Sequence, residues 1–162
     1  MNLVFTNKID GIDLERLMDI YEESNWENLS MVKSDNKDIS DKNILYQKVR
    51  TSYKSYIQNE FLKNGNNYLA ILKDEKNYLA ALRIYDEDDF YLIEALETKP
   101  EYRRCGYGEN LLREAFSFFE KGREIRSEVS LTNKKRLDLH KKLGFKIIEK
   151  RRNNLLLTYK ID

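Results

Sequence analysis

The chain contains a glycine-bearing turn that could bind a phosphate, and it also contains two glutamates and a histidine that could move protons nearby. The turn is Arg103 to Gly108, which reads Arg-Arg-Cys-Gly-Tyr-Gly. Glycine has no Cβ, so the backbone can approach an anion, and a following helix would supply free N–H groups and the positive end of its dipole. Ordinary turns also contain glycine pairs, so these glycines alone predict only a turn.

Two familiar phosphate loops do not match the residues after these glycines. A Walker loop requires Lys-Ser or Lys-Thr after its last glycine, and neither pair follows here. A dinucleotide-binding fingerprint requires a third Gly or Ala where this chain has Leu111. The remaining pattern is Arg-x-x-Gly-x-Gly, preceded by Pro100-Glu101-Tyr102.

This longer pattern resembles the acetyl-CoA pyrophosphate loop of the GNAT N-acetyltransferase superfamily, which reads Gln/Arg-x-x-Gly-x-Gly/Ala. A second segment, Asn133 to Phe145, resembles the later helix of the same family, which runs from Asn to a Tyr or His seven residues on and ends in Gly-Phe. The two segments follow each other in the family's order, whereas the first half of the chain resembles the family only in its order of elements. The resemblance implies acetyl-CoA as co-substrate and no metal.

The resemblance also implies which residues contact the cofactor. Asn133 would lie beside the pantetheine arm, the strand end would pair with that arm, and amide groups of the turn would hold the pyrophosphate. A backbone N–H of the strand would stabilise the tetrahedral oxyanion. The predicted cofactor-binding residues are Leu96, Glu97, Thr98, Arg103, Arg104, Cys105, Gly106, Tyr107, Gly108 and Asn133. Asn133 is also a preferred residue type for a helix N-cap, and the two roles are compatible.

Acetyl transfer to an amine needs a base, because an amine with a pKa of about 10.4 is mostly protonated at pH 7. A positioned carboxylate is typically worth about 10²- to 10⁴-fold in rate. Glu94 and Glu97 lie on the strand before the turn, and alternation along a strand would point them to opposite faces. Polyamine-type members of the family place a glutamate at the position of Glu94, so we predict Glu94 as the base. A bulge in this strand, which is common in the family, would change the face of the sheet to which each side chain points. Glu97 therefore stays an alternative for the base.

His140 stands where much of the family has a tyrosine close to the CoA sulfur, and several small-molecule acetyltransferases have histidine there. With a pKa of about 6.5, a histidine is partly protonated at pH 7 and could donate to a departing thiolate. The alternative is a ring packed among the neighbouring leucines of its helix. We predict His140 as the acid.

The acceptor is an amine of a small molecule or peptide whose identity the sequence leaves open. In the family, the region after the first strand walls the acceptor site, and here it supplies Glu22, Glu23, Trp26 and Glu27. An acidic and aromatic wall would suit a cationic amine. The interpretation we favour is that Glu22 and Glu23 are helix surface and Trp26 is core.

Two classes of function follow from these residues. The leading one is an N-acetyltransferase in which the amine attacks acetyl-CoA directly, with Glu94 as base and His140 as acid. The alternative is a catalytically silent acyl-CoA-binding or regulatory module that keeps the turn but lacks a working base.

Composition fits a single domain over residues 1–162, with 41% hydrophobic residues to form a core. Lysine and arginine (29) nearly balance aspartate and glutamate (28), so we expect neither a nucleic-acid nor a membrane partner. One cysteine and no signal peptide at Met1 to Thr6 favour the cytoplasm. Both a monomer and a homodimer stay open.

The elements that must position these residues are predicted from hydrophobic periodicity and turn residues. We expect an α/β layered, GNAT-like fold with a mixed, mostly antiparallel sheet of six to seven strands flanked by about four helices. Residues 29–42 are predicted as a mobile loop and Asp86 to Asp89 as a solvated acidic turn. The expected strands are 3–6, 67–73, 77–83, 90–98, 125–130, 146–151 and 155–160, and the expected helices lie near 14–21, 45–57, 107–119 and 134–143.

Overall fold

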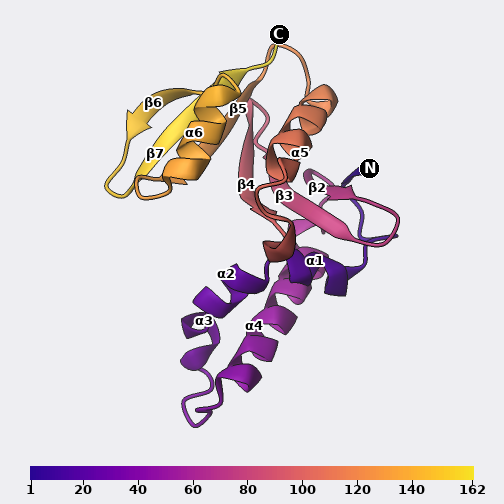
Figure 1. Ribbon diagram of the computed structural model, residues 1–162, viewed down its shortest axis with the longest axis vertical. Helices are drawn as coiled ribbons and strands as arrows, with labels where there is room; N and C mark the ends of the chain where they lie inside the picture. The colour runs from indigo at the N-terminus through magenta and orange to yellow at the C-terminus, as the bar shows by residue number, and fades with distance from the viewer.

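The computed structural model describes residues 1–162 as one mixed sheet with helices on both of its faces (Figure 1). The sheet order is β1-β2-β3-β4-β5-β7-β6. The strands are β1 (Asn2–Thr6), β2 (Asn67–Lys73), β3 (Tyr78–Asp86), β4 (Phe90–Thr98), β5 (Glu124–Ser130), β6 (Lys146–Lys150) and β7 (Asn154–Lys160). Only β4 and β5 pair in parallel, so the predicted mixed, mostly antiparallel α/β sheet is confirmed.

The helices outnumber the expected four. They are α1 (Leu14–Ile20), α2 (Glu22–Glu27), α3 (Ser30–Lys33), α4 (Lys42–Tyr56), α5 (Tyr107–Ala115) and α6 (Lys134–Lys142). A π-helical turn, Ile57–Phe61, continues α4, and short 3₁₀ turns lie at Pro100–Tyr102 and Phe116–Phe118. The expectation that residues 29–42 are entirely loop is wrong, because α3 forms inside that segment and packs beside α4.

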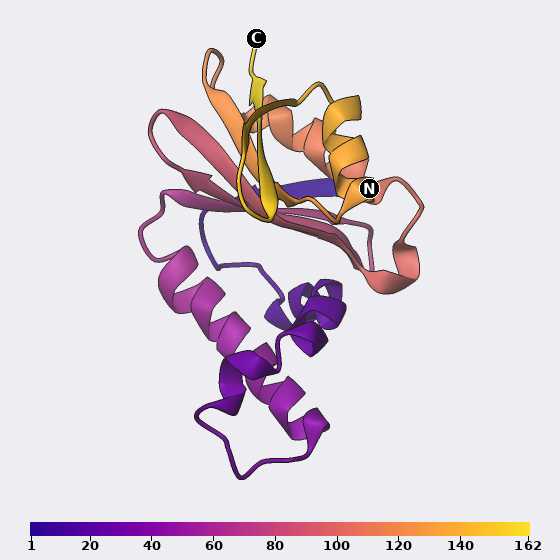
Figure 2. The same ribbon diagram turned by 90° about the vertical axis from the view of Figure 1, so that its left-hand side faces the viewer.

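Figure 2 shows the layers: α5 and α6 cover one face of the sheet, and α1 to α4 lie on the other. Each layer has its own core. Leu111, Leu112 and Leu137 belong to the cluster under α5 and α6, whereas Leu17 and Ile57 belong to the cluster under α1 and α4. The central strands are buried on both faces, which explains why their sequences are nearly continuous apolar runs.

The sheet opens between its two parallel strands. Strand β4 pairs with β5 only from Phe90 to Ile93, although β4 continues to Thr98 along β3. Strand β5 likewise continues beyond Ser127 with β7 as its partner. The end of β4 therefore has a free edge that faces the start of α6.

A bulge interrupts β4 before that free edge. The register against β3 shifts between Ala81, which opposes Glu97, and Arg83, which opposes Glu94, and Ala95 adopts a φ of 51°. Because Ala81 and Arg83 are two residues apart, their partners lie on the same face. The expectation that Glu94 and Glu97 face opposite sides is therefore wrong, since the extra residue of the bulge restores the same facing.

The predicted acidic turn is only partly solvated. Asp88 and Asp89 are exposed, whereas the Asp86 carboxylate accepts from Arg123 Nη2 at 2.6 Å. This ion pair holds the pKa of Asp86 below its usual range. No helix in this structure has the length and apolar character needed to cross a membrane.

Candidate active site

A cavity of about 630 Å³ collects the predicted cofactor residues at the open end of β4. It lies among the β4 end, the turn before α5 and residues of α2 and α6. The predicted residues that line it are Leu96, Glu97, Thr98, Arg103, Arg104, Gly106, Tyr107, Gly108 and Asn133. Cys105 is the exception, because its side chain is exposed outside the cavity. We call this the first cavity.

The turn before α5 leaves the first amide groups of that helix without a partner in the chain. Gly106 is the N-cap in the left-handed region, with φ +77°, and no side chain caps the helix. The first N–H groups of a helix have no intrahelical acceptor. A Cβ at Gly108 would stand 3.4 Å from Thr98 Oγ1, so glycine keeps the helix start close to the end of β4.

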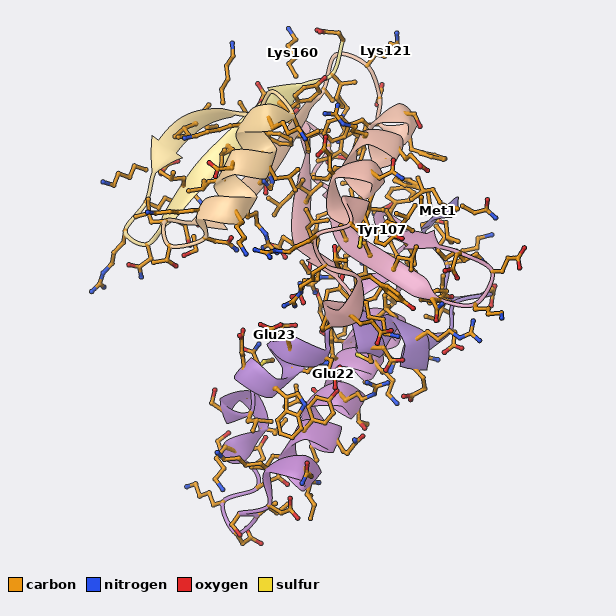
Figure 3. The ribbon with its side chains drawn as sticks, in the orientation of Figure 1. Met1, Glu22, Glu23, Tyr107, Lys121 and Lys160 are labelled. Carbon is orange, nitrogen blue, oxygen red and sulfur yellow. The ribbon has the colours of Figure 1, made fainter.

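Cationic and acidic side chains meet around the first cavity. Arg103 Nη1 donates to the Glu23 carboxylate, which joins the turn to α2. In Figure 3, Glu23 lies on the helix below this turn and Tyr107 lies at the start of the helix above it. Arg136 Nη2 donates to the carbonyl of Leu96 and so spans the opening between α6 and β4. Arg104 and Lys135 complete the cationic lining.

A second cavity, also of about 630 Å³, lies below the bulge among α2, α3 and α4. Its lining includes Tyr53, Tyr56 and Arg83, and it shares Ser24 and Glu97 with the first cavity. Glu97 therefore stands where the two cavities adjoin. No local sequence pattern could have found this second cavity, because its walls come from four separate segments.

The carboxyl group of Glu97 is partly buried, and burial raises its pKa above the usual glutamate value. The nearby hydroxyl of Ser24 acts in the opposite direction, as do the nearby guanidinium groups of Arg136 and Arg103. Beside it, Tyr21 Oη donates to the carbonyl of Ala95 at 2.8 Å and fixes the bulge. The sequence predicted only that Tyr21 lies at the end of a helix near 14–21, which gave no sign of this role.

Glu94 lies in a more open environment than Glu97. Its side chain is 43% exposed, and its carboxylate is 3.5 Å from Arg83 Nη2. Glu94 and His140 both line a third cavity of about 370 Å³, located where β4 and β5 separate. The structure thus brings the two predicted catalytic residues to one opening, away from the junction at Glu97.

His140 is buried, with 1% of its surface exposed, and both ring nitrogens have partners. Nδ1 lies 2.8 Å from the carbonyl oxygen of Arg136, and Nε2 lies 2.9 Å from Ser127 Oγ. A carbonyl only accepts, so we assign the proton to Nδ1 and let Nε2 accept from the Ser127 hydroxyl. Burial lowers the pKa of His140, so the ring is neutral at pH 7.

The residues expected to wall the acceptor site separate into two groups. Glu23 and Glu27 line the first cavity, whereas Glu22 and Trp26 line neither the first nor the second. The expectation that Trp26 is core is wrong: it is 37% exposed, and its ring stacks on Tyr46 at 4.3 Å between centroids. No group of three His, Cys, Asp or Glu side chains is arranged to hold a metal ion.

Comparison with known proteins gives one family and many similar structures. Residues 20–145 match the model of the acetyltransferase (GNAT) family. The PaiA N-acetyltransferase from Thermoplasma acidophilum, solved in complex with coenzyme A, is 22% identical, with 99% of each chain covered and a TM-score of 0.71. PH1933 from Pyrococcus horikoshii OT3 is 16% identical over 99% of each chain, with a TM-score of 0.66.

A third solved structure, the ribosomal-protein-S18-alanine N-acetyltransferase from Escherichia coli, is 20% identical. The alignment covers 70% of this chain and 77% of that one, with a TM-score of 0.58. At these identities the likeness shows a shared fold. No curated protein sequence matches the chain significantly.

Proposed function

Because this chain belongs to the GNAT acetyltransferase family, as its turn and late helix predicted, we propose that it moves an acetyl group from acetyl-CoA to a primary amine by direct attack. The observation that carries the proposal is the junction of two cavities at Glu97. The first cavity suits the donor and the second suits the acceptor. A carboxylate between them can take the proton that the amine must lose.

The first cavity fits the donor in its chemistry. The uncapped start of α5 offers N–H groups to a pyrophosphate, and Arg104 and Lys135 add positive charge. The free edge of β4 from Leu96 to Thr98 can pair with the amide groups of a pantetheine arm. Such an arm would replace Arg136 as the partner of the Leu96 carbonyl.

In the proposed reaction, the amine enters the second cavity as an ammonium ion and gives one proton to Glu97. Its nitrogen then forms a bond to the thioester carbonyl carbon, and N–H groups freed by the bulge at Ala95 stabilise the oxyanion. Collapse of this intermediate breaks the C–S bond. The thiolate leaves with the electron pair and takes up a proton, while the amide nitrogen loses its second proton.

We propose Glu97 as the base, and Glu94, which the family resemblance implied, stays the alternative. Burial raises the pKa of Glu97 toward the pH at which the reaction runs, which makes its carboxylate a stronger base. Glu94 is more exposed and is paired with Arg83. Two observations therefore support Glu97 as the base: it stands where the first and second cavities adjoin, and its carboxyl group is partly buried.

For His140 we propose a positioning role. A neutral ring whose Nδ1 proton is bonded to the Arg136 carbonyl has no proton to give to a thiolate. It instead orients Ser127 and ties α6 to β5 beside the opening. The role of His140 as the acid stays a prediction, and the variant His140→Gln distinguishes it from the positioning role.

We expect His140→Gln to lower the melting temperature by several degrees, because a buried ring with two hydrogen bonds is lost, at about 2–4 °C per kcal/mol for a chain of this size. Turnover should fall less than about 10-fold, and the pH profile of kcat should keep the shape of the wild-type profile. Thermal unfolding and kcat from pH 6 to 10 measure both effects. If kcat of the wild type falls as the pH rises and His140→Gln abolishes that fall, His140 is the acid.

Release of free thiol from acetyl-CoA across a panel of primary amines tests the function directly. We expect at least one amine to raise thiol release well above hydrolysis and to gain an acetyl group by mass spectrometry. Tight CoA binding without amine-dependent release would favour the alternative, a catalytically silent acyl-CoA-binding or regulatory module.

A further inference from the structure

The guanidinium group of Arg83 lies in the wall of the second cavity with its hydrogen-bonding capacity unused. Its side chain is 16% exposed, and Nε is buried without a partner. Its one contact with an anion is the 3.5 Å ion pair with Glu94, which is too long for a strong hydrogen bond. A guanidinium carries five N–H donors, so this arginine can still bind a planar acceptor.

Two other buried arginines of the chain differ from Arg83 in that their Nη groups donate to carboxylates, although Nε of Arg123 is likewise buried without a partner. Arg50, with 12% of its side chain exposed, donates to Asp19 at 2.9 Å and also to Glu15. Arg123, with 15% exposed, donates to Asp86 at 2.6 Å. Both satisfy their charge with carboxylates at hydrogen-bonding distance, as buried charges normally do. Arg83, equally buried, lacks such a partner and borders a cavity.

Aromatic rings stabilise the charge of Arg83 without using its donors. Its Cζ lies 5.3 Å from the ring centroid of Tyr56, 5.5 Å from that of Tyr53 and 5.8 Å from that of Phe61. Cation–π attraction acts through the ring faces, so the N–H groups stay available. Tyr53 and Tyr56 also line the second cavity. The side chain of Arg83 is thus held as a cation, and its free N–H donors border the second cavity.

We propose that the acceptor amine also carries a carboxylate, which Arg83 binds while Glu97 receives the amine. This inference rests on the proposed function. Arg83 lies two residues along β3 from Ala81, the partner of Glu97, so the side chains of Arg83 and Glu97 start from the same face of the sheet as diagonal neighbours, with their Cα atoms about 7–8 Å apart. An amino acid or a short peptide, with opposite charges a few bonds apart, matches this arrangement.

The charges of the second cavity disfavour two other classes of acceptor. An extended polycation would bring positive charge to Arg83, the one cationic residue in the wall. A dianionic phosphate would face Glu60 and Glu97 in the same wall, with a single arginine to neutralise it. One cation and two carboxylates in the same wall suit a ligand that is itself a zwitterion.

Matched pairs of amines test this proposal with the full chain and acetyl-CoA. Butylamine and 4-aminobutyrate present amines of similar basicity and differ in the carboxylate; a dipeptide and its C-terminal amide form a second pair. We expect kcat/KM to be at least about 10-fold higher for the carboxylated member of one pair, as for one charge-assisted hydrogen-bonded contact. Equal rates within both pairs, or spermidine as the best substrate, would overturn the proposal.

Arg83→Met should remove this preference. We expect kcat/KM for the carboxylated amine to fall about 10- to 100-fold and that for its neutral partner to change less than about 2-fold. Arg83→Lys, which keeps the charge but not the planar fork, should retain part of the preference. Arg123→Met is the matched control, because it removes an equally buried arginine remote from the cavity and should leave the preference intact.

The outcomes separate the inference from the function on which it rests. If no amine raises thiol release, the proposed function fails. If amines are acetylated but Arg83→Met lowers both members of a pair equally, only the inference fails. If Arg83→Met does not fold, two other measurements test the inference. One is the preference of Arg83→Lys for the carboxylated amine, and the other is the change in melting temperature when 4-aminobutyrate is added to the CoA-bound wild type. The inference is refuted if Arg83→Lys keeps the full preference and 4-aminobutyrate does not change the melting temperature.

Discussion

Glu97→Gln should lower kcat by about 10²- to 10⁴-fold, the range that a positioned base contributes. Glutamine keeps the size of the side chain, but it cannot accept the proton of an ammonium ion. The affinity for CoA should change little, because the first cavity keeps its turn and its cations. Steady-state kinetics with the best amine, together with calorimetric titration of CoA, measure the two quantities separately.

The pH profile of the wild type should carry the signature of Glu97. A base must be deprotonated to act, and burial raises the pKa of this carboxyl. As the pH is lowered, kcat should therefore begin to fall at a pH above the ordinary glutamate pKa of about 4.3, and we call this fall the acid limb. In Glu97→Gln this limb should vanish, and the residual rate should depend only on the fraction of amine that is free.

Glu94→Gln is the matched control for this variant, since both glutamates lie on the same face of β4. We expect it to lower kcat less than about 10-fold and to keep the acid limb. If Glu94→Gln instead removes the limb while Glu97→Gln keeps it, the base is Glu94, as the family resemblance implied.

The raised pKa of Glu97 also predicts that this carboxyl group destabilises the fold at neutral pH. Because its pKa is higher in the folded chain, the folded state binds the proton more tightly than the unfolded state, and stability falls as the pH rises through that window. Glu97→Gln removes this cost. Its melting temperature should exceed that of the wild type at pH 7 and approach it at pH 4.

The turn and the late helix were predictable because each depends on neighbouring residues. A left-handed N-cap requires glycine, here Gly106, and an asparagine cap such as Asn133 bonds the amide three residues on. The strands were predictable from apolar runs with turn residues between them. Which of these residues line the first cavity was implied by the family resemblance and not by these local rules.

The remaining features depend on contacts between distant segments. The bulge at Ala95 is fixed by Tyr21, which is 74 residues away in sequence, so alternation alone gave the wrong facing for Glu94 and Glu97. The hydrogen bonding of His140, on α6, depends on Ser127, which lies on β5. Residues 29–42 have a polar composition typical of loops, but α3 forms there because it can pack against α4.

Gly106→Ala should weaken CoA binding by about 10- to 100-fold, the loss expected for one or two charge-assisted hydrogen bonds. Gly106 has a φ of +77°, and an added Cβ would meet no atom within 4 Å, so the whole effect arises from the backbone. Alanine disfavours this conformation by about 1–2 kcal/mol. Relief of that strain would turn the N–H groups at the start of α5 away from a bound pyrophosphate.

Gly11→Ala is the control for this variant, because Gly11 has the same φ of +77° and the same open space but lies before α1. Both substitutions carry the same backbone strain and should lower the melting temperature alike, whereas only Gly106→Ala should weaken CoA binding. Titration of CoA against both variants and the wild type gives the comparison. Equal affinity for CoA in all three proteins would mean that the turn does not bind the pyrophosphate, and the donor would have to be held elsewhere.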